Sequence, residues 1–278
     1  MTGSVPITMA PTAAATLDLR PLSSPLLSAQ PGVVHGITRR QPGLGAADAN
    51  MSYTAPRDIE DAWRVRQRWC AAIGVDPDRL VTTGQIHSNG VLRVRAGQAG
   101  AGARPGAARA GVADALITNE PGVVLLSMHA DCLPILLVDP VSPAVGVVHA
   151  GWRGTVANVA GAAIAALTAE FGTDPGRVLA YLGPAIAADC YEVGADVAES
   201  WAGRVGVANA HHGLRSSGSR WTFDLSAANS RLLLEAGVHP RHIDHSGICT
   251  RCGGADWFSH RGQGPATGRF GAIIALTG

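Results

Sequence analysis

Four short apolar segments follow one another between residues 115 and 149, and they constrain the fold more than any other feature of the sequence. Runs of roughly four to eight apolar residues, bounded by turn-forming residues, are typical of strands buried on both faces. We therefore predict buried strands over residues 115–118, 123–127, 133–138 and 145–149.

Helices and further strands are expected around these segments. Residues 57–73 and 155–171 repeat apolar side chains at helical spacing, and a glycine follows each of them. Residues 224–236 form a third helical pattern, with Asp224 as its N-cap. Additional short strands are predicted over residues 80–83, 91–94, 178–182 and 270–276.

The order of these elements mixes β-hairpin and strand–helix–strand signals. We therefore predict an α+β fold of layered mixed β-sheets flanked by helices, with a single catalytic domain over residues 31–278. Residues 1–30 are rich in Thr, Ala, Ser and Pro without a sustained period, which indicates a flexible N-terminal extension. The Gly-, Ala- and Arg-rich residues 96–111 indicate a loop insertion.

Charge and cysteine content narrow the functional class. The net charge is +1, so no overall field attracts nucleic acid or an anionic membrane. All 22 basic residues are Arg, which excludes lysine Schiff-base chemistry and favours Arg for binding anions. The five Cys are scattered, which is unlike a secreted disulfide framework, and no signal peptide is evident, so we expect the protein in the cytoplasm.

Reactive side chains gather beside glycines in three segments, over residues 85–90, 129–134 and 149–154. Each segment follows or precedes a predicted strand, so His87, Cys132 and His149 could converge on one point. Two imidazoles and one thiolate suit zinc and leave its fourth position open, as in catalytic zinc sites. Asp131 could orient a ligand histidine, or it could stabilise a turn.

Two other hypotheses use the same region. Cys132 and His149 could instead form a metal-free nucleophile and base, as in an amidase. Arg39 and Arg40 follow an apolar segment that ends at Ile37, and Arg153 precedes the predicted helix, so these guanidinium groups could bind phosphate. The CxxC pair over residues 249–252 has no second pair, which disfavours both a structural zinc site and a redox motif.

Taken together, short motifs along the chain resemble the YfiH-type family, also called laccase-domain or polyphenol-oxidase-like proteins. The motifs are HG at 35–36, TRR at 38–40, QIH at 85–87, ADALIT at 113–118, ADCLP at 130–134, HAGWRG at 149–154, GPAI at 183–186, CYEV at 190–193, CT at 249–250, WFSHR at 257–261 and TGR at 267–269.

This resemblance implies a zinc site on His87, Cys132 and His149. It also implies purine nucleoside phosphorylase activity on adenosine, inosine and methylthioadenosine, with adenosine deaminase activity beside it. Some members of the family are described as copper-dependent polyphenol oxidases, and others are linked to editing of peptidoglycan precursors. The substrates implied are a purine nucleoside and phosphate, and the substrate-side loop is expected to include Asn50.

The sequence also departs from the family pattern. The stretch at residues 41–43 is QPG rather than a glycine-rich run, the loop before Asn50 is only a weak match, and His260 replaces the usual aromatic residue. The chain has ten His and no His-x-His pair, although a multicopper laccase needs many paired histidines. A single His2Cys site therefore favours zinc, with one copper ion as the alternative.

Overall fold

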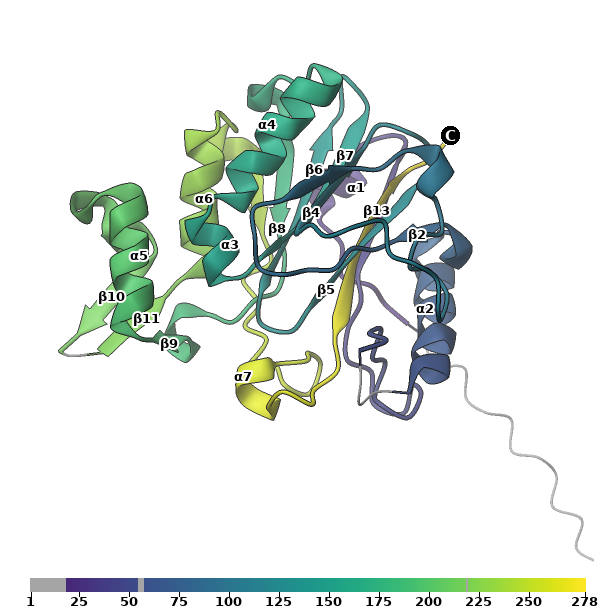
Figure 1. The fold of residues 1–278 in the computed structure, drawn as a ribbon, viewed down its shortest axis with the longest axis horizontal. Coiled ribbons are helices and arrows are strands. Elements are labelled where there is room, and N and C mark those ends of the chain that lie inside the picture. Colours follow the sequence, from purple (N-terminus) through teal and green to yellow (C-terminus); the bar gives the residue numbers. More distant parts are fainter. Residues whose placement is uncertain (1–18, 55–57, 219) are drawn as a thin grey trace, which may run out of the picture.

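Two β-sheets packed face to face carry helices on their outer sides (Figure 1). The structure, a computed structural model, describes residues 19–54, 58–218 and 220–278. A four-stranded sheet has the order β1-β13-β5-β2, with β1 over Val33–Ile37, β13 over Phe270–Leu276, β5 over Val124–His129 and β2 over Leu80–Val81. A six-stranded sheet has the order β12-β8-β6-β7-β4-β3, with β12 over Ile243–His245, β8 over Leu179–Leu182, β6 over Leu133–Asp139, β7 over Ala144–Ala150, β4 over Ala115–Thr118 and β3 over Val91–Arg93.

A small third sheet and the helices complete the fold. The third sheet has the order β10-β11-β9, with β10 over Leu214–Ser217, β11 over Arg220–Phe223 and β9 over Glu192–Val193. The helices are α1 over Pro25–Ser28, α2 over Ile59–Ile73, α3 over Trp152–Val156, α4 over Val159–Phe171, α5 over Ala195–Val205, α6 over Leu225–Glu235 and α7 over His260–Gln263. In Figure 1, α5 and the third sheet project to one side, away from the two large sheets.

The hydrophobic core is divided into layers by strands with apolar residues on both faces. In β6, Ile135 and Leu137 pack towards α4 and α6, whereas Leu136 and Val138 pack towards the four-stranded sheet. This division follows from the alternation of side chains along a strand. The outer face of the four-stranded sheet packs against α2. The order of layers is therefore helix, sheet, sheet, helix, which confirms the predicted α+β fold with mixed sheets.

The prediction of one continuous helix over residues 155–171 is wrong, because the segment forms two helices. The chain forms α3 from Trp152 and then breaks at Asn158, whose φ is 65° and ψ 47°. Asparagine adopts this left-handed conformation at low cost, and its side chain caps α4 by accepting a hydrogen bond from the Gly161 N–H. As a result, Arg153 lies inside the first turn of α3 rather than before a helix.

The flexible extension predicted over residues 1–30 is corrected in its second part. Residues 1–18 lie outside the described residues, but the chain from residue 19 is built into the fold. Leu22 pairs with Ile37 through backbone hydrogen bonds, and Leu27 in α1 is fully buried. The buried Ser24 backbone N–H donates to the ring of His35. These contacts move the boundary of the folded region ahead of residue 31.

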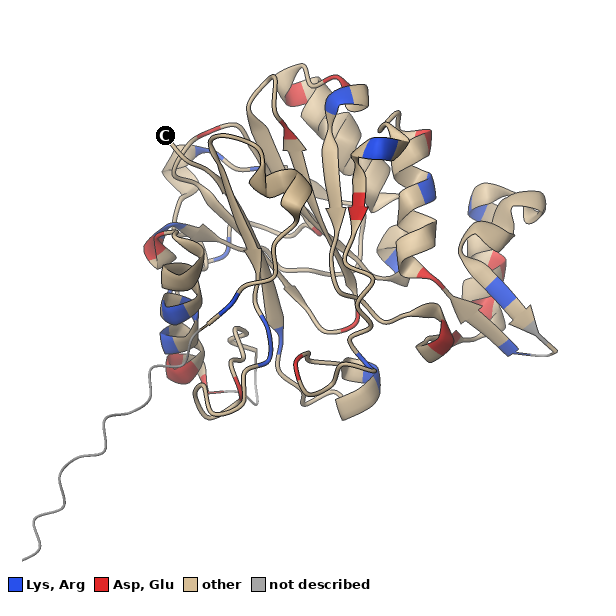
Figure 2. Cartoon of the chain, turned by 180° about the vertical axis from the view of Figure 1, so that it is seen from behind, with Lys and Arg blue, Asp and Glu red and all other residues tan. Residues whose placement is uncertain are grey.

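Charge is dispersed over the surface, in agreement with the sequence. Figure 2 shows acidic and basic residues interspersed on the helices and loops. In the part of the chain that the structure describes, no helix is long and apolar enough to cross a membrane.

The division of the core into layers predicts where truncation is costly. Leu137 is fully buried in the central strand β6, so Leu137→Ala should lower the free energy of unfolding by about 2–5 kcal/mol in urea denaturation. Leu234→Ala is the matched control because Leu234 is 44% exposed on α6, and its loss should be below about 1 kcal/mol. Equal losses in the two variants would contradict the assignment of this core.

Candidate metal centre

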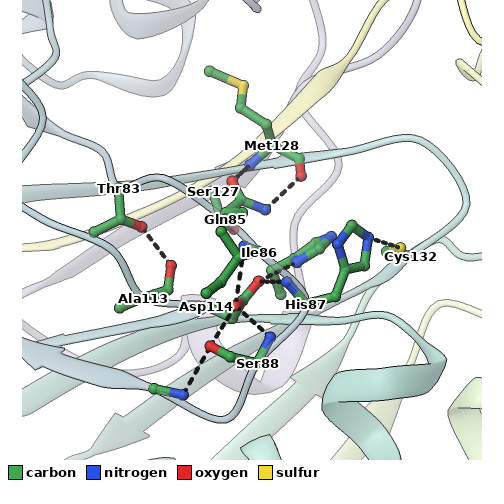
Figure 3. Close-up of polar contacts among 12 residues, drawn as sticks. Thr83, Gln85, Ile86, His87, Ser88, Ala113, Asp114, Ser127, Met128 and Cys132 are labelled. Atoms are coloured by element: carbon green, nitrogen blue, oxygen red, sulfur yellow. Dashed lines mark hydrogen bonds and ion pairs between the residues drawn. The ribbon is translucent and has the colours of Figure 1, made fainter.

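The fold brings His87, Cys132 and His149 together. Their ligand atoms all lie within 4.8 Å of one another, and the Cys132 Sγ is 3.8 Å from the His87 Nε2 (Figure 3). The rings of His87 and His149 stand edge to face with centroids 4.9 Å apart. His87 is exposed, Cys132 is half-buried and His149 is buried, so the group is open to solvent from one side only.

Strand register explains this convergence. In the antiparallel pair of β6 and β7, Leu133 lies opposite Ala150 and Pro134 opposite His149. Cys132, one residue before β6, therefore stands beside the end of β7. His87 comes from the loop between β2 and β3, and this loop lies at the same end of the strands, because β3 begins opposite Ala115, which pairs with Val148 in β7.

The Asp114 carboxylate holds this arrangement in place. It accepts a hydrogen bond from His149 Nδ1 at 2.9 Å, which leaves His149 Nε2 to face the site. It also accepts the backbone N–H groups of Ile86, His87 and Ser88 at 3.2, 3.0 and 2.7 Å and the Ser88 hydroxyl at 2.8 Å (Figure 3). One buried carboxylate thus fixes the ring of one ligand and the backbone of another. These bonds hold His87 at a positive φ of 63°.

Two further side chains support the loop and the wall of the site. The Gln85 amide bonds both the N–H and the C=O of Met128 in β5, at 2.8 and 2.9 Å, and so ties the His87 loop to the other sheet. His129 is buried, with Nε2 2.7 Å from the Ser127 hydroxyl and Nδ1 3.1 Å from the Cys132 carbonyl oxygen. Burial and the charge of His149 lower the pKa of His129, and both of its ring nitrogens already have hydrogen-bond partners, so we assign it a structural role.

Gly151 provides the space that the ligands need. A Cβ at this position would lie 2.7 Å from the His87 Cδ2 and 3.0 Å from the Cys132 Sγ. Any larger residue would therefore displace the two ligands. The HAGWRG motif contains this glycine, although sequence reasoning did not assign it a role.

The electrostatics favour a charged thiolate beside a charged imidazole. Burial alone would raise the pKa of the Cys132 thiol, but the charge of His149 and hydrogen bonds from both histidines lower it to about 6. Burial alone would lower the pKa of His149, but Cys132 and Asp114 raise it to about 9. The hydrogen bonds from His149 and Ser88 overcome burial and hold the pKa of Asp114 well below its usual range.

Asp131 does not orient a ligand histidine, which corrects that part of its predicted role. Its carboxylate accepts the Thr250 hydroxyl at 2.7 Å and the Arg261 backbone N–H at 2.6 Å. Asp131 has a φ of 82°, and its own carbonyl accepts the Ile186 N–H. Asp131, which is next to Cys132, therefore holds the segments around Thr250 and Arg261 in place. The carboxylate that orients a histidine of the site is Asp114.

A cavity of about 520 Å³ opens in front of the three ligands. Its lining includes His87, Cys132, His149, Asp131 and Arg153, which are five of the predicted site residues. The lining also includes basic residues that sequence reasoning missed, namely Arg66, Arg109, Arg261 and Arg269. Only Arg261 and Arg269 lie in motifs, as parts of WFSHR and TGR, and those motifs could have drawn attention to them.

Three residues predicted to bind phosphate or substrate lie outside the lining of this cavity. Arg40 donates to the Gly254 carbonyl and pairs with Asp48 at 2.8 Å. Asn50 uses its side chain to accept the Arg269 backbone N–H at 2.9 Å and to bond Ser52. The Arg39 guanidinium lies 5.7 Å from the centre of the Trp257 ring. Through these contacts Arg40 and Asn50 hold nearby loops, and a role of Arg39, Arg40 or Asn50 in binding phosphate or substrate stays a prediction.

The donor set fits a metal ion. Two imidazoles and one thiolate are ligands that both zinc and copper accept, and three protein ligands leave one position for a substrate or solvent. The hydrogen bond from His149 Nδ1 to a carboxylate is the arrangement that orients histidines in metal sites. His87, Cys132 and His149 are therefore a candidate metal centre.

Known proteins resemble this chain over most of its length. The family model described as multi-copper polyphenol oxidoreductase laccase matches residues 34–277. Purine nucleoside phosphorylase YlmD of Geobacillus stearothermophilus is 33% identical over 246 residues, which cover 87% of this chain and 90% of the relative. A protein named adenosine deaminase RL5, from an unknown prokaryotic organism, is 36% identical over 253 residues, covering 85% of this chain and 92% of the relative.

A solved structure agrees with these sequence matches. The crystal structure of YlmD from Geobacillus stearothermophilus superposes with a TM-score of 0.86 at 32% identity, and covers 92% of this chain and 94% of that chain. Because the family model matches most of the chain and the fold is shared, the chain belongs to the laccase-like YfiH family.

Proposed function

We propose that this protein is a zinc-dependent purine nucleoside phosphorylase that cleaves adenosine, inosine and methylthioadenosine, with adenosine deaminase activity at the same site. The observation that carries the proposal is the convergence of His87, Cys132 and His149 on a cavity that is also lined by arginines. The relatives named purine nucleoside phosphorylase and adenosine deaminase support it. The catalytic domain would begin near residue 19 rather than at residue 31.

The cavity suits a nucleoside and an anion. Its volume of about 520 Å³ lies in the usual range of roughly 300–1,000 Å³ for small-molecule sites. The rings of Trp152 and Tyr191 line it and could pack against a purine. The Arg153 guanidinium lies 4.2 Å from the centre of the Trp152 ring and could bind phosphate with a planar pair of donors.

The chain's own residues would act mainly by positioning the substrates and by stabilising the charge that develops on them. In phosphorolysis, phosphate attacks C1′ of the ribose while the bond to the purine breaks and C1′ gains positive charge. Arg153 would hold the attacking phosphate, and the buried wall of the cavity would exclude competing water. Zinc held by His87, Cys132 and His149 would supply a Lewis acid that stabilises negative charge on an oxygen of the bound substrates.

A metal-free hydrolase is the second candidate, and one observation favours it. The lowered pKa of Cys132 and the raised pKa of His149 are what a Cys–His nucleophilic pair requires. Such an enzyme would be an amidase or a peptidoglycan-precursor editing hydrolase, and a copper-dependent polyphenol oxidase is a third alternative. A Cys–His pair needs only one histidine as its base, whereas His87 adds a third donor atom within 4.8 Å of the other two, so we favour the metal centre.

Inosine cleavage tests the proposed activity. With zinc-loaded protein, release of hypoxanthine should require inorganic phosphate and yield ribose 1-phosphate, and a chelator should abolish it. His87→Ala should lower kcat/KM by at least about 100-fold because one of three ligands is lost. Chromatographic quantification of base and sugar phosphate measures both effects.

The matched control is His211→Ala, because His211 is an exposed histidine outside the cavity lining. It should retain the activity of the unmodified chain. Cleavage that survives chelation and is blocked only by thiol alkylation would replace the phosphorylase with the Cys–His hydrolase. Ammonia release from adenosine without phosphate would test the deaminase activity separately.

Removing the charge of Asp114 should weaken metal binding. Asp114→Asn keeps the size of the side chain but loses the charge that orients His149 and the His87 loop, so zinc affinity should fall about 10–100-fold. Competition with a chromophoric chelator measures this affinity. Asp139→Asn is the control. Asp139 is as buried as Asp114 and likewise accepts backbone N–H groups of a turn, but it lies at the end of β6 that is far from Cys132. Equal zinc affinity in all three proteins would refute the role of Asp114.

A further inference from the structure

A second group of sulfur atoms lies outside the candidate metal centre. Cys190 ends a short 3-10 helix, while Cys249 and Cys252 stand in the turn after β12. Their ligand atoms all lie within 4.8 Å of one another, and the Sγ atoms of Cys190 and Cys252 are 3.3 Å apart. The sequence shows only the CxxC pair, and the fold adds Cys190 from a distant segment.

Backbone groups already favour a charged ligand in this cluster. The Cys249 Sγ accepts the N–H of Ala187 at 3.4 Å and the N–H of Cys252 at 3.5 Å. A thiolate that accepts backbone N–H groups is prepared to bind a cation.

The spacing of the sulfur atoms fits a tetrahedral metal ion. Zinc with Zn–S bonds of about 2.3 Å places its sulfur ligands about 3.8 Å apart. The closest pair of sulfurs is 3.3 Å apart and all three lie within 4.8 Å, so small side-chain rotations bring them to this spacing. Cys190 and Cys249 are half-buried and Cys252 is exposed, so an ion can enter from solvent.

We propose that Cys190, Cys249 and Cys252 form a second metal site, which binds a thiophilic divalent cation of the zinc type. Three thiols lose their protons to solvent, three metal–sulfur bonds form, and solvent supplies the fourth ligand. The site is distinct from the centre on His87, Cys132 and His149, because the two groups share no residue.

The second site would stabilise one wall of the cavity. Thr250 lies between the two cysteines of the CxxC turn, and its buried hydroxyl donates to Asp131, which precedes Cys132. Arg251 from the same turn donates to the Cys190 carbonyl oxygen at 3.1 Å. A metal ion that fixes residues 249–252 therefore also fixes the partner of Asp131. Its role is structural, since none of its ligands lines the cavity.

A disulfide between Cys190 and Cys252 is the competing explanation for their close approach. It would leave Cys249 unused, although the Cys249 Sγ lies within 4.8 Å of both other sulfurs and accepts two backbone N–H groups. A metal site accounts for all three sulfurs, and for this reason we favour it.

Zinc counting on the full chain tests the proposal. The protein is kept in a non-thiol reductant, stripped of metal, loaded with zinc and desalted, and its zinc is measured by elemental analysis. The Cys190→Ser/Cys252→Ser variant should bind one zinc ion fewer per chain than the unmodified protein. With cobalt as the probe, the near-ultraviolet thiolate-to-cobalt band should lose most of its intensity in this variant. The Cys70→Ala control should keep both the full count and the band, because Cys70 is buried in a different part of the core.

The difference between variants is the readout, so the test is independent of whether the His87 centre binds zinc or of what it catalyses. Alkylation followed by peptide mass spectrometry gives a second measurement without a variant, in which zinc should protect Cys252 from a reagent that otherwise modifies it. Equal zinc counts in the variant and the unmodified protein would overturn the proposal. So would alkylation of Cys252 at the same rate with and without zinc, or a Cys190–Cys252 disulfide that forms in place of zinc binding.

Discussion

The site depends on the hydrogen bonds that the buried carboxylate of Asp114 accepts. Asp114 stands just before β4, beside the end of β7, and there it accepts hydrogen bonds from His149 and from the backbone of the His87 loop. The metal-ligand segments come from different parts of the chain, so no local structure could fix their geometry. Asp114 fixes two of them at once, and the pairing of β6 with β7 places the third. The layered core makes this possible by holding the strands rigidly on both faces.

Much of the fold could be predicted from the sequence because its strands are continuous apolar runs. β4 and β13 have the predicted bounds, and β5, β6 and β7 differ from prediction by only a few residues. The break between α3 and α4 was missed because helical periodicity continues across Asn158. The third sheet was missed because its strands are short and partly exposed. Helix α5 was overlooked, although its buried residues Val197, Ala198 and Trp201 follow helical spacing.

The convergence of the three candidate ligands could be predicted because reactive residues followed strand ends and matched ordered family motifs. Asp114 was part of a motif, but its role appears only when the His87 loop is seen to fold around it. The contacts of Arg40 and Asn50 with nearby loops could not be predicted, because a basic or amide side chain near a motif does not reveal its direction. The three-thiol cluster was missed because Cys190 joins the CxxC turn only through tertiary contacts.

Zinc-edge X-ray absorption tests most directly whether one His2Cys centre binds zinc beside the cavity. The sample is the Cys190→Ser/Cys252→Ser chain loaded with a single zinc ion, so that only this centre contributes. We predict one sulfur ligand at about 2.3 Å and two imidazole nitrogens at about 2.0–2.1 Å. A shell without sulfur, or one without imidazole, would contradict it.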